Sequence, residues 1–186
     1  MLKFSFSTLF GVYFKSMSMA KNIKKEKLIA LVETISRPGT AAVVELIRNS
    51  NFASKFGGAS HHRYRGGLVD HSLEVYEYMK EKANGLDIPE ESLIVCSIFH
   101  DLGKLRGHYN HQFESVAILE ECGFQLNEEE KLAITTHHEM DGAFRTGSLQ
   151  SLLKKSDVKS TGADARKNGS NLSLKEIALM IYGEMS

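Results

Sequence analysis

The stretch CSIFHDLGK, residues 96–104, lies near the middle of the chain. Apolar residues from Leu93 onward lead through it to the pair His100-Asp101. A segment that is apolar on every side predicts a buried helix, and Gly103 is expected to end it. An imidazole and a carboxylate therefore lie at the inner end of a core helix. Because a buried, unpaired carboxylate costs several kcal/mol, we expect other segments to supply partners for Asp101.

The composition is typical of a single globular domain with a sizeable core. The 186 residues carry no net charge, which argues against a protein that coats nucleic acid. The two cysteines form no CxxC pair, so a disulfide framework is excluded and a reducing, cytoplasmic location is favoured. No run of about 18 apolar residues is present, so neither a membrane-spanning helix nor a membrane partner is expected.

Hydrophobic periodicity predicts an all-α protein, folded as a single helical bundle. The expected helices cover residues 22–36, 40–49, 68–83, 89–102, 111–122, 127–138 and 147–158, with a last helix from Ser173. The polar, glycine-containing segment 159–171 is expected to be a loop. Residues 1–20 are expected to be a poorly ordered extension, or to lie upstream of the true start, and residues 21–186 to form the domain.

Further polar side chains fall on the apolar faces of the expected helices, at i, i+3 or i+4 spacing. They are His71, His111, His137, His138 and Asp157. Each of these residues could instead have a purely structural role without a metal ion. A buried histidine, for example, is more often a hydrogen-bonded core residue than a ligand. Bundles nevertheless build metal sites from side chains on facing helices, and one site shared with His100 and Asp101 explains them all. Imidazoles and carboxylates suit one or two divalent ions of Mn, Fe, Ni, Co or Zn.

This arrangement resembles the HD-domain superfamily of metal-dependent phosphohydrolases. The residues that carry the likeness stand in the order His71, His100, Asp101 and Asp157. The motif HDLGK at residues 100–104 is similar to the HDxGK motif of that superfamily. The likeness covers about residues 61–158 and implies an HD-type helical domain in which those four residues bind one metal ion.

The additional histidines resemble a dinuclear branch of the same superfamily, the HD-GYP group. The segments His111-Gln112-Phe113 and Thr136-His137-His138-Glu139 are similar to parts of that group. This likeness implies that His111, His137 and His138 bind a second ion. Gly142-Ala143-Phe144 stands where the GYP tripeptide would come, so specificity for cyclic-di-GMP is not expected.

A second likeness concerns residues 61–73, HHRYRGGLVDHSL. They resemble the beginning of the HD domain in bacterial 3′–5′ exoribonucleases, in which an OB-type nucleic-acid-binding module precedes that domain. The 60 residues before His61 read as helical, so that module is not expected here. The loop has two glycines that permit close backbone approach to a ligand. Arg63, Arg65 and His62 are candidate phosphate contacts, although a solvated loop is an equally good interpretation of the arginines.

These residues predict a phosphohydrolase that cleaves a phosphoester or phosphoanhydride of a nucleotide or similar small substrate with a metal-activated water. Asp101 would orient the water or share its proton, and Lys104 would contact a phosphate oxygen as a point charge. One alternative is an exonuclease-like phosphodiesterase acting on short single-stranded RNA or DNA. Another is a metal-binding regulatory module without turnover. The oligomeric state is left open by the sequence.

Overall fold

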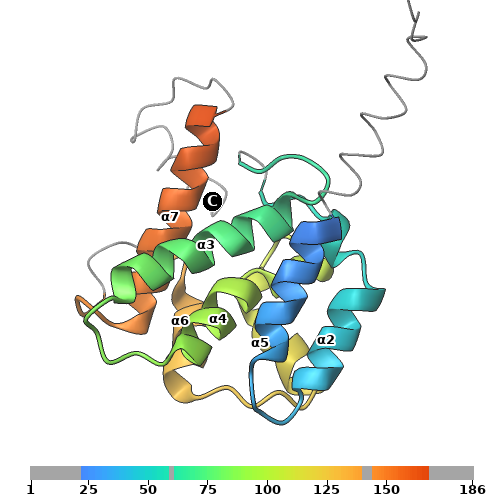
Figure 1. Ribbon diagram of the computed structural model, residues 1–186, viewed down its shortest axis with the longest axis horizontal. Coiled ribbons are helices and arrows are strands. Elements are labelled where there is room, and N and C mark those ends of the chain that lie inside the picture. The colour runs from blue at the N-terminus through green and yellow to red at the C-terminus, as the bar shows by residue number, and fades with distance from the viewer. Residues whose placement is uncertain (1–21, 59–60, 140–143, 168–186) are drawn as a thin grey trace, which may run out of the picture.

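The computed structural model describes residues 22–58, 61–139 and 144–167, and this part of the chain is helical, without a strand. A first helix covers residues 22–33. The elements that follow are α2 (Thr40–Asn49), the 3-10 turn η1 (Phe52–Ser54), α3 (Gly67–Ala83), α4 (Glu90–Phe99), the 3-10 turn η2 (Leu102–Leu105), α5 (His111–Glu121), α6 (Glu128–Thr136) and α7 (Leu149–Lys167). Helix α3 crosses the molecule, with α7 on one side and α2 on the other (Figure 1). The predicted all-α fold is confirmed.

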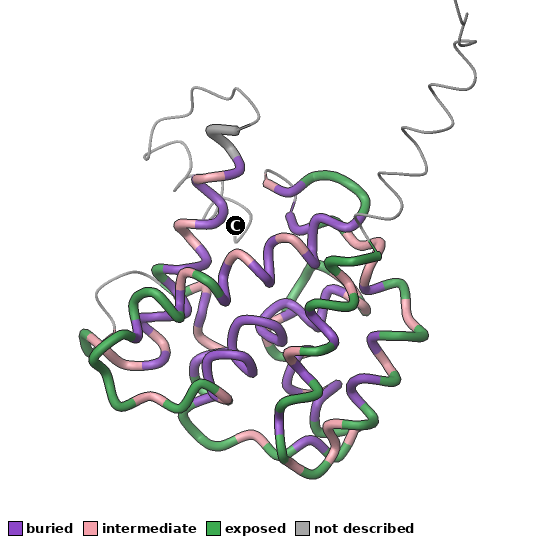
Figure 2. Tube along the Cα trace, in the orientation of Figure 1, coloured by how far each residue is buried: buried purple, intermediate pink, exposed green. Residues whose placement is uncertain are grey.

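Helix α4 is the centre of the core, and it packs against α3, α6 and α7. Pro89 precedes it. Glu90 and Glu91 lie in its first turn, where their negative charges interact favourably with the positive end of the helix dipole. Every residue from Ser92 to Phe99 is buried, as the continuous buried colour along this helix shows (Figure 2). Each large apolar side chain buried in this way contributes about 1.5–3 kcal/mol relative to exposure. The helix ends at Phe99, earlier than the predicted stop at Gly103, which lies instead in η2.

A buried carboxylate joins α6 to the rest of the core. Helix α6 begins with a capping box: Asn127 accepts a hydrogen bond from the backbone of Glu130, and the Glu130 side chain accepts one from the backbone of Asn127. The carboxylate of Glu130 also binds Arg37 through two hydrogen bonds of 2.6 and 2.8 Å, and Ser92 of α4 donates to it at 2.7 Å. These contacts satisfy a charge that would be costly to bury alone.

Helix α7 is longer than predicted. The loop expected over 159–171 is wrong for residues 159–167, which continue the helix from Leu149 to Lys167. In its second half, the hydroxyl of Ser160 lies 3.1 Å from His71 Nδ1 and donates to Glu74 at 3.0 Å, both on α3, and the neighbouring Thr161 is also buried. Small side chains allow two helices to approach closely, but they give no large apolar stripe, and periodicity therefore misses this half. The predicted helix from Ser173 and the predicted extension over 1–20 lie outside the described residues.

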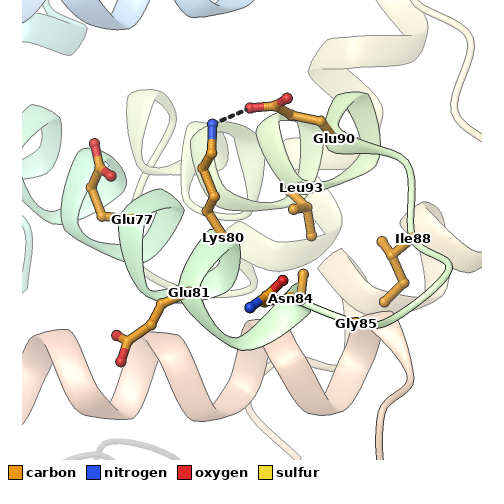
Figure 3. A pocket seen from close by; sticks show the side chains of 9 residues that line it. Glu77, Lys80, Glu81, Asn84, Gly85, Ile88, Glu90 and Leu93 are labelled. Carbon is orange, nitrogen blue, oxygen red and sulfur yellow. Dashed lines mark hydrogen bonds and ion pairs between the residues drawn. The ribbon is translucent and has the colours of Figure 1, made fainter.

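A surface groove of about 630 Å³ lies between the end of α3 and the start of α4 (Figure 3). Its wall includes the ion pair between Lys80 Nζ and Glu90, at 2.5 Å. None of the predicted site residues lines it. Among the described helices, none has the length and apolar character needed to cross a membrane.

Candidate metal centre

The four residues of the HD likeness meet in the interior of the bundle. His71 lies on α3, His100 directly follows α4, Asp101 precedes η2, and Asp157 lies on α7. His71 Nε2 is 3.3 Å from His100 Nε2 and 3.2 Å from Asp157 Oδ1. Asp101 Oδ2 is 3.6 Å from His71 Nε2 and 3.5 Å from His100 Nε2. The ligand atoms of four residues from three separate segments of the chain thus face one small volume.

The other three predicted histidines form an adjoining group. His111 begins α5, and His137 and His138 directly follow α6. His111 Nε2 is 2.9 Å from His138 Nε2 and 2.9 Å from Asp101 Oδ1. His137 Nε2 is 3.9 Å from the same Asp101 oxygen. The two carboxylate oxygens of Asp101 therefore face different groups of histidines.

Backbone carbonyls determine which nitrogen of three histidines is protonated. The Nδ1 atoms of His100, His111 and His137 lie 3.0, 2.7 and 2.7 Å from the carbonyl oxygen three residues earlier. A carbonyl only accepts, so each Nδ1 carries the hydrogen and each neutral ring keeps a lone pair on Nε2. Metal-binding histidines typically make such an outer contact, which fixes the tautomer and the orientation of the ring.

The histidine Nε2 atoms that face the centre have too few hydrogen-bond donors for their lone pairs. The Nε2 atom of His137 is buried and has no hydrogen-bond partner. Burial lowers the pKa of His100 and places that of His137 well below its ordinary value, so these rings are neutral near pH 7. Burial likewise lowers the pKa of His138 to about 4. Lone pairs that converge with carboxylates in this way fit a divalent cation, and the mixed N/O donor set suits Mn, Fe, Co, Ni or Zn.

Both carboxylates of the centre are ionised. Burial opposes ionisation of Asp101, but Lys104 and the neighbouring histidines outweigh it and hold its pKa well below the ordinary range. Burial acts in the same direction on Asp157, whose pKa is nevertheless held well below its ordinary value, chiefly by a hydrogen bond with His71. Ionised carboxylates are the form that binds metal ions.

Gly103 brings α5 close to the centre. A Cβ atom at this position would overlap the backbone carbonyl oxygen of His111. The N–H of Gly103 donates to Ser115 Oγ at 2.8 Å, and that hydroxyl lies 2.8 Å from the carbonyl oxygens of both His100 and His111. The glycine of the HDLGK motif therefore sets the distance between the two histidine groups.

The predicted phosphate contacts divide into two kinds. Lys104 is buried: its Nζ lies 2.6 Å from Asp101 Oδ2 and also donates to the carbonyl of Gly57. His62 is buried beside the centre, with its ring centroid 5.3 Å from that of His71. Arg63 and Arg65 are exposed on the loop before α3. Phosphate contact by these four residues stays a prediction.

Several residues around the centre were not expected from the sequence. Ser115, Glu74, Ser160 and Asp164 all make hydrogen bonds to a site residue or to one another. Helical spacing could have indicated one of them, because Glu74 follows His71 by three positions on a predicted helix. Ser160 and Asp164 gave no such signal, since their segment was predicted to be a loop.

Comparison with known protein families agrees with this geometry. A family model of the HD domain matches residues 68–181. The chain belongs to the HD-domain family. HD domains are mostly metal-dependent phosphohydrolases, and the His and Asp groups of this HD domain are placed to hold a metal ion. Searches of curated proteins and of solved structures found no match. The likenesses to HD-GYP proteins and to exoribonucleases stay predictions.

Proposed function

We propose that this HD domain binds two divalent metal ions and hydrolyses a phosphoester or phosphoanhydride of a nucleotide or similar small substrate. One ion would be held by His71, His100, Asp101 and Asp157. The other would be held by His111, His137, His138 and the second oxygen of Asp101. The observation that carries the proposal is the position of Asp101, whose Oδ2 faces His71 and His100 while Oδ1 faces His111 and His137.

Divalent ions at such a site lower the pKa of water and polarise phosphoryl oxygens. The chain contributes an ionised Asp101, which accepts a hydrogen bond from the attacking water and so orients it. Lys104 Nζ, 2.6 Å from Asp101 Oδ2, balances the charge of this carboxylate. The same ammonium is the nearest candidate to bind a phosphate oxygen when a substrate reaches the centre.

The basic side chains on the loop before α3 favour binding of an anionic substrate. Arg63 and Arg65 are exposed there and flank Tyr64, whose hydroxyl donates to Asp70 Oδ2 at 2.8 Å. A guanidinium can bind a phosphate with two parallel hydrogen bonds. The aromatic ring between the arginines provides a surface on which a base can stack.

The alternative substrate is the end of a short single-stranded RNA or DNA. Tyr109 and Phe113 are exposed on either side of His111, and Phe56 is exposed next to Gly57, whose carbonyl contacts Lys104. Exposed aromatic rings near basic side chains are typical of single-strand binding, because successive bases stack on them. A regulatory module without turnover remains the second alternative, and the absence of hydrolysis would favour it.

Metal analysis combined with a substrate screen tests the proposal. The purified protein, loaded with Mn²⁺, is assayed on mono- and dinucleotides, cyclic nucleotides and a labelled oligonucleotide. We expect hydrolysis of a small nucleotide, with His100→Ala losing bound metal and activity together. His108→Ala is the matched control, because this exposed histidine contacts the centre through its backbone carbonyl, which alanine keeps. Full metal occupancy without turnover on any phosphoester would refute hydrolysis, and stepwise shortening of the oligonucleotide would instead establish the nuclease.

A further inference from the structure

One face of α7 extends from the metal centre to the loop before α3. Asp157, Ser160 and Asp164 follow one another at intervals of three and four residues, so they share this face of the helix. Asp157 Oδ1 lies 3.2 Å from His71 Nε2 in the metal centre. Seven residues later, or about 10 Å along the helix axis, Asp164 Oδ2 accepts a hydrogen bond of 2.6 Å from the backbone N–H of His62.

His62 is the residue at which the loop turns. Its backbone φ is 46°, a left-handed conformation that is uncommon outside glycine. Its N–H donates to Asp164, and its carbonyl accepts from the N–H groups of Gly57 and Tyr64, at 3.0 and 2.8 Å. A Cβ atom at Gly67 would overlap the same carbonyl oxygen, so the chain also passes close to the start of α3. An unfavourable backbone conformation of this kind persists only where surrounding contacts hold it.

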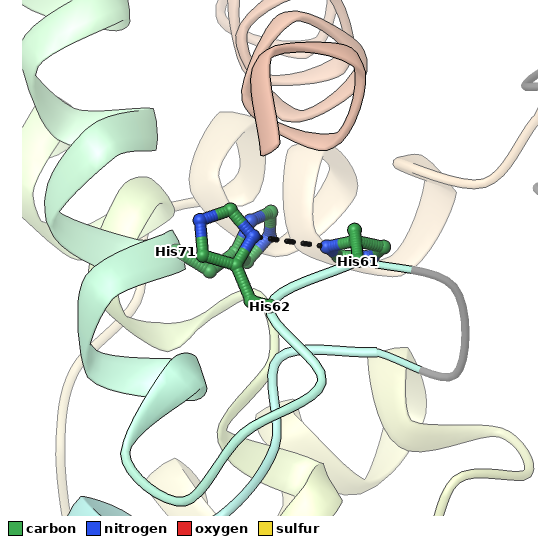
Figure 4. Close-up of side chains that lie close together, drawn as sticks. All are labelled: His61, His62 and His71. Carbon is green, nitrogen blue, oxygen red and sulfur yellow. Dashed lines mark hydrogen bonds between the residues drawn. The ribbon is translucent and has the colours of Figure 1, made fainter. Parts of the chain in front are cut away.

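The turn separates an inner side of the loop from an outer side. His61, directly before the turn, is half-buried, and its ring centroid is 4.9 Å from that of His71 at the metal centre (Figure 4). Arg63 and Arg65, after the turn, are exposed. The backbone conformation of His62 therefore determines where these three side chains stand relative to the metal centre.

The contact from Asp164 reaches the turn from a distant segment, 102 residues along the chain. Asp164 is buried, and it lies on the helix that also carries Asp157. Because a helix is rigid over two turns, this contact holds the loop at a fixed distance from the metal centre.

We propose that Asp164 is a positioning residue for substrate binding, which fixes the turn at His62 and so places the side chains on both sides of the turn to contact the phosphate of the substrate. This inference deepens the proposed function and rests on it, since it assumes that a substrate phosphate binds at the metal centre. Asp164 itself touches neither the metal nor the substrate, and its effect passes through the backbone of the loop.

The test compares Asp164→Ala with the wild type in three measurements. Hydrogen exchange of the His62 amide, followed by NMR in the metal-free protein, reports the contact itself. Calorimetry with inorganic phosphate and the Mn²⁺-loaded protein reports the loop, and titration with Mn²⁺ reports the metal centre. We expect the His62 amide to exchange about 10- to 100-fold faster, the effect of losing one hydrogen bond to a charged group. Affinity for phosphate should fall about 2- to 10-fold, as for a weakened hydrogen bond, while affinity for Mn²⁺ stays that of the wild type.

Three further variants separate positioning from general destabilisation. Asp164→Asn keeps an oxygen that accepts from the His62 N–H, so it should restore most of the wild-type amide exchange and phosphate affinity. Asp164→Glu keeps the charge but moves the acceptor by one methylene, so it should behave like Asp164→Ala. Asp87→Ala is the control, because Asp87 is exposed between α3 and α4, and it should match the wild type in all three measurements.

The outcomes distinguish this inference from the proposed function. If Asp164→Ala leaves either the amide exchange or the phosphate affinity unchanged, or weakens Mn²⁺ binding as much as phosphate binding, Asp164 is not a positioning residue. A wild-type protein that binds no phosphate overturns the inference as well. Should Asp164→Ala fail to fold, Asp164→Glu decides by the same measurements. If the Mn²⁺-loaded wild type hydrolyses no phosphoester, the proposed function fails, while amide exchange and phosphate binding still decide what Asp164 does.

Discussion

Replacing Lys104 with methionine tests whether its ammonium belongs to the metal centre. In the structure Lys104 Nζ lies 2.6 Å from Asp101 Oδ2, and both side chains are buried. The variant leaves a buried carboxylate without its cation and the carbonyl of Gly57 without this donor. Breaking a buried ion pair by removing one partner costs about 3–5 kcal/mol. For a chain of this size, each kcal/mol corresponds to about 2–4 °C, so the metal-free variant should melt about 6–20 °C lower.

Thermal unfolding followed by circular dichroism, in chelator and in saturating Mn²⁺, measures this effect. The loss should be smaller with Mn²⁺, because a bound cation compensates the charge of Asp101. The double variant Asp101→Asn/Lys104→Met should lose less than the sum of the two single variants, since it removes both charges. Lys131→Met is the control, because Lys131 forms an exposed pair with Glu120, and exposed ion pairs contribute little to stability. An unchanged melting temperature of metal-free Lys104→Met, or strict additivity in the double variant, would refute the assigned role.

Three further results are expected. Arg37→Ala should lower the free energy of unfolding in urea by about 3–5 kcal/mol, because Glu130 is fully buried, whereas the same substitution at the exposed Arg48 should change it little. Burial raises the pKa of Glu130 but Arg37 outweighs it, so the folded pKa is lowered. The stability that Glu130 contributes is thus complete above its unfolded pKa of about 4.3 and is lost as the pH falls through the folded pKa. If the free energy of unfolding falls equally steeply with decreasing pH in Glu130→Gln, this interpretation is contradicted. Gly103→Ala should push the start of α5 outward and weaken Mn²⁺ binding at the His111 group by about 10- to 100-fold, and unchanged affinity in a titration would oppose this.

The sequence predicted the parts of the centre that local chemistry determines. His100-Asp101 follows an apolar run, and this run is indeed a buried helix. His71 shares an apolar face on α3 and is buried there, so its inward direction was predictable from helical spacing. The seven predicted ligands do meet in space, and their binding of metal stays a prediction.

What the sequence could not show depends on contacts between distant segments. The second half of α7 has small polar residues that are helical because they pack on α3, a tertiary effect that local periodicity does not record. In the sequence, Glu74 resembles an ordinary surface acid. Its hydrogen bond with Ser160 forms only because α7 packs against α3. Gly103 was interpreted as a helix stop, although its main requirement is the close approach of His111. In each case the partner lies on another helix.

The most direct test of the central claim is the number of divalent ions that bind to the metal-free protein. Mn²⁺ is titrated into the protein, and the free ion is measured by electron paramagnetic resonance. Because Asp101 presents one oxygen to each histidine group, we predict two ions per wild-type chain and one in His111→Ala. A wild-type chain that binds no ion, or the same number of ions in both proteins, would contradict a dinuclear centre built around His100-Asp101.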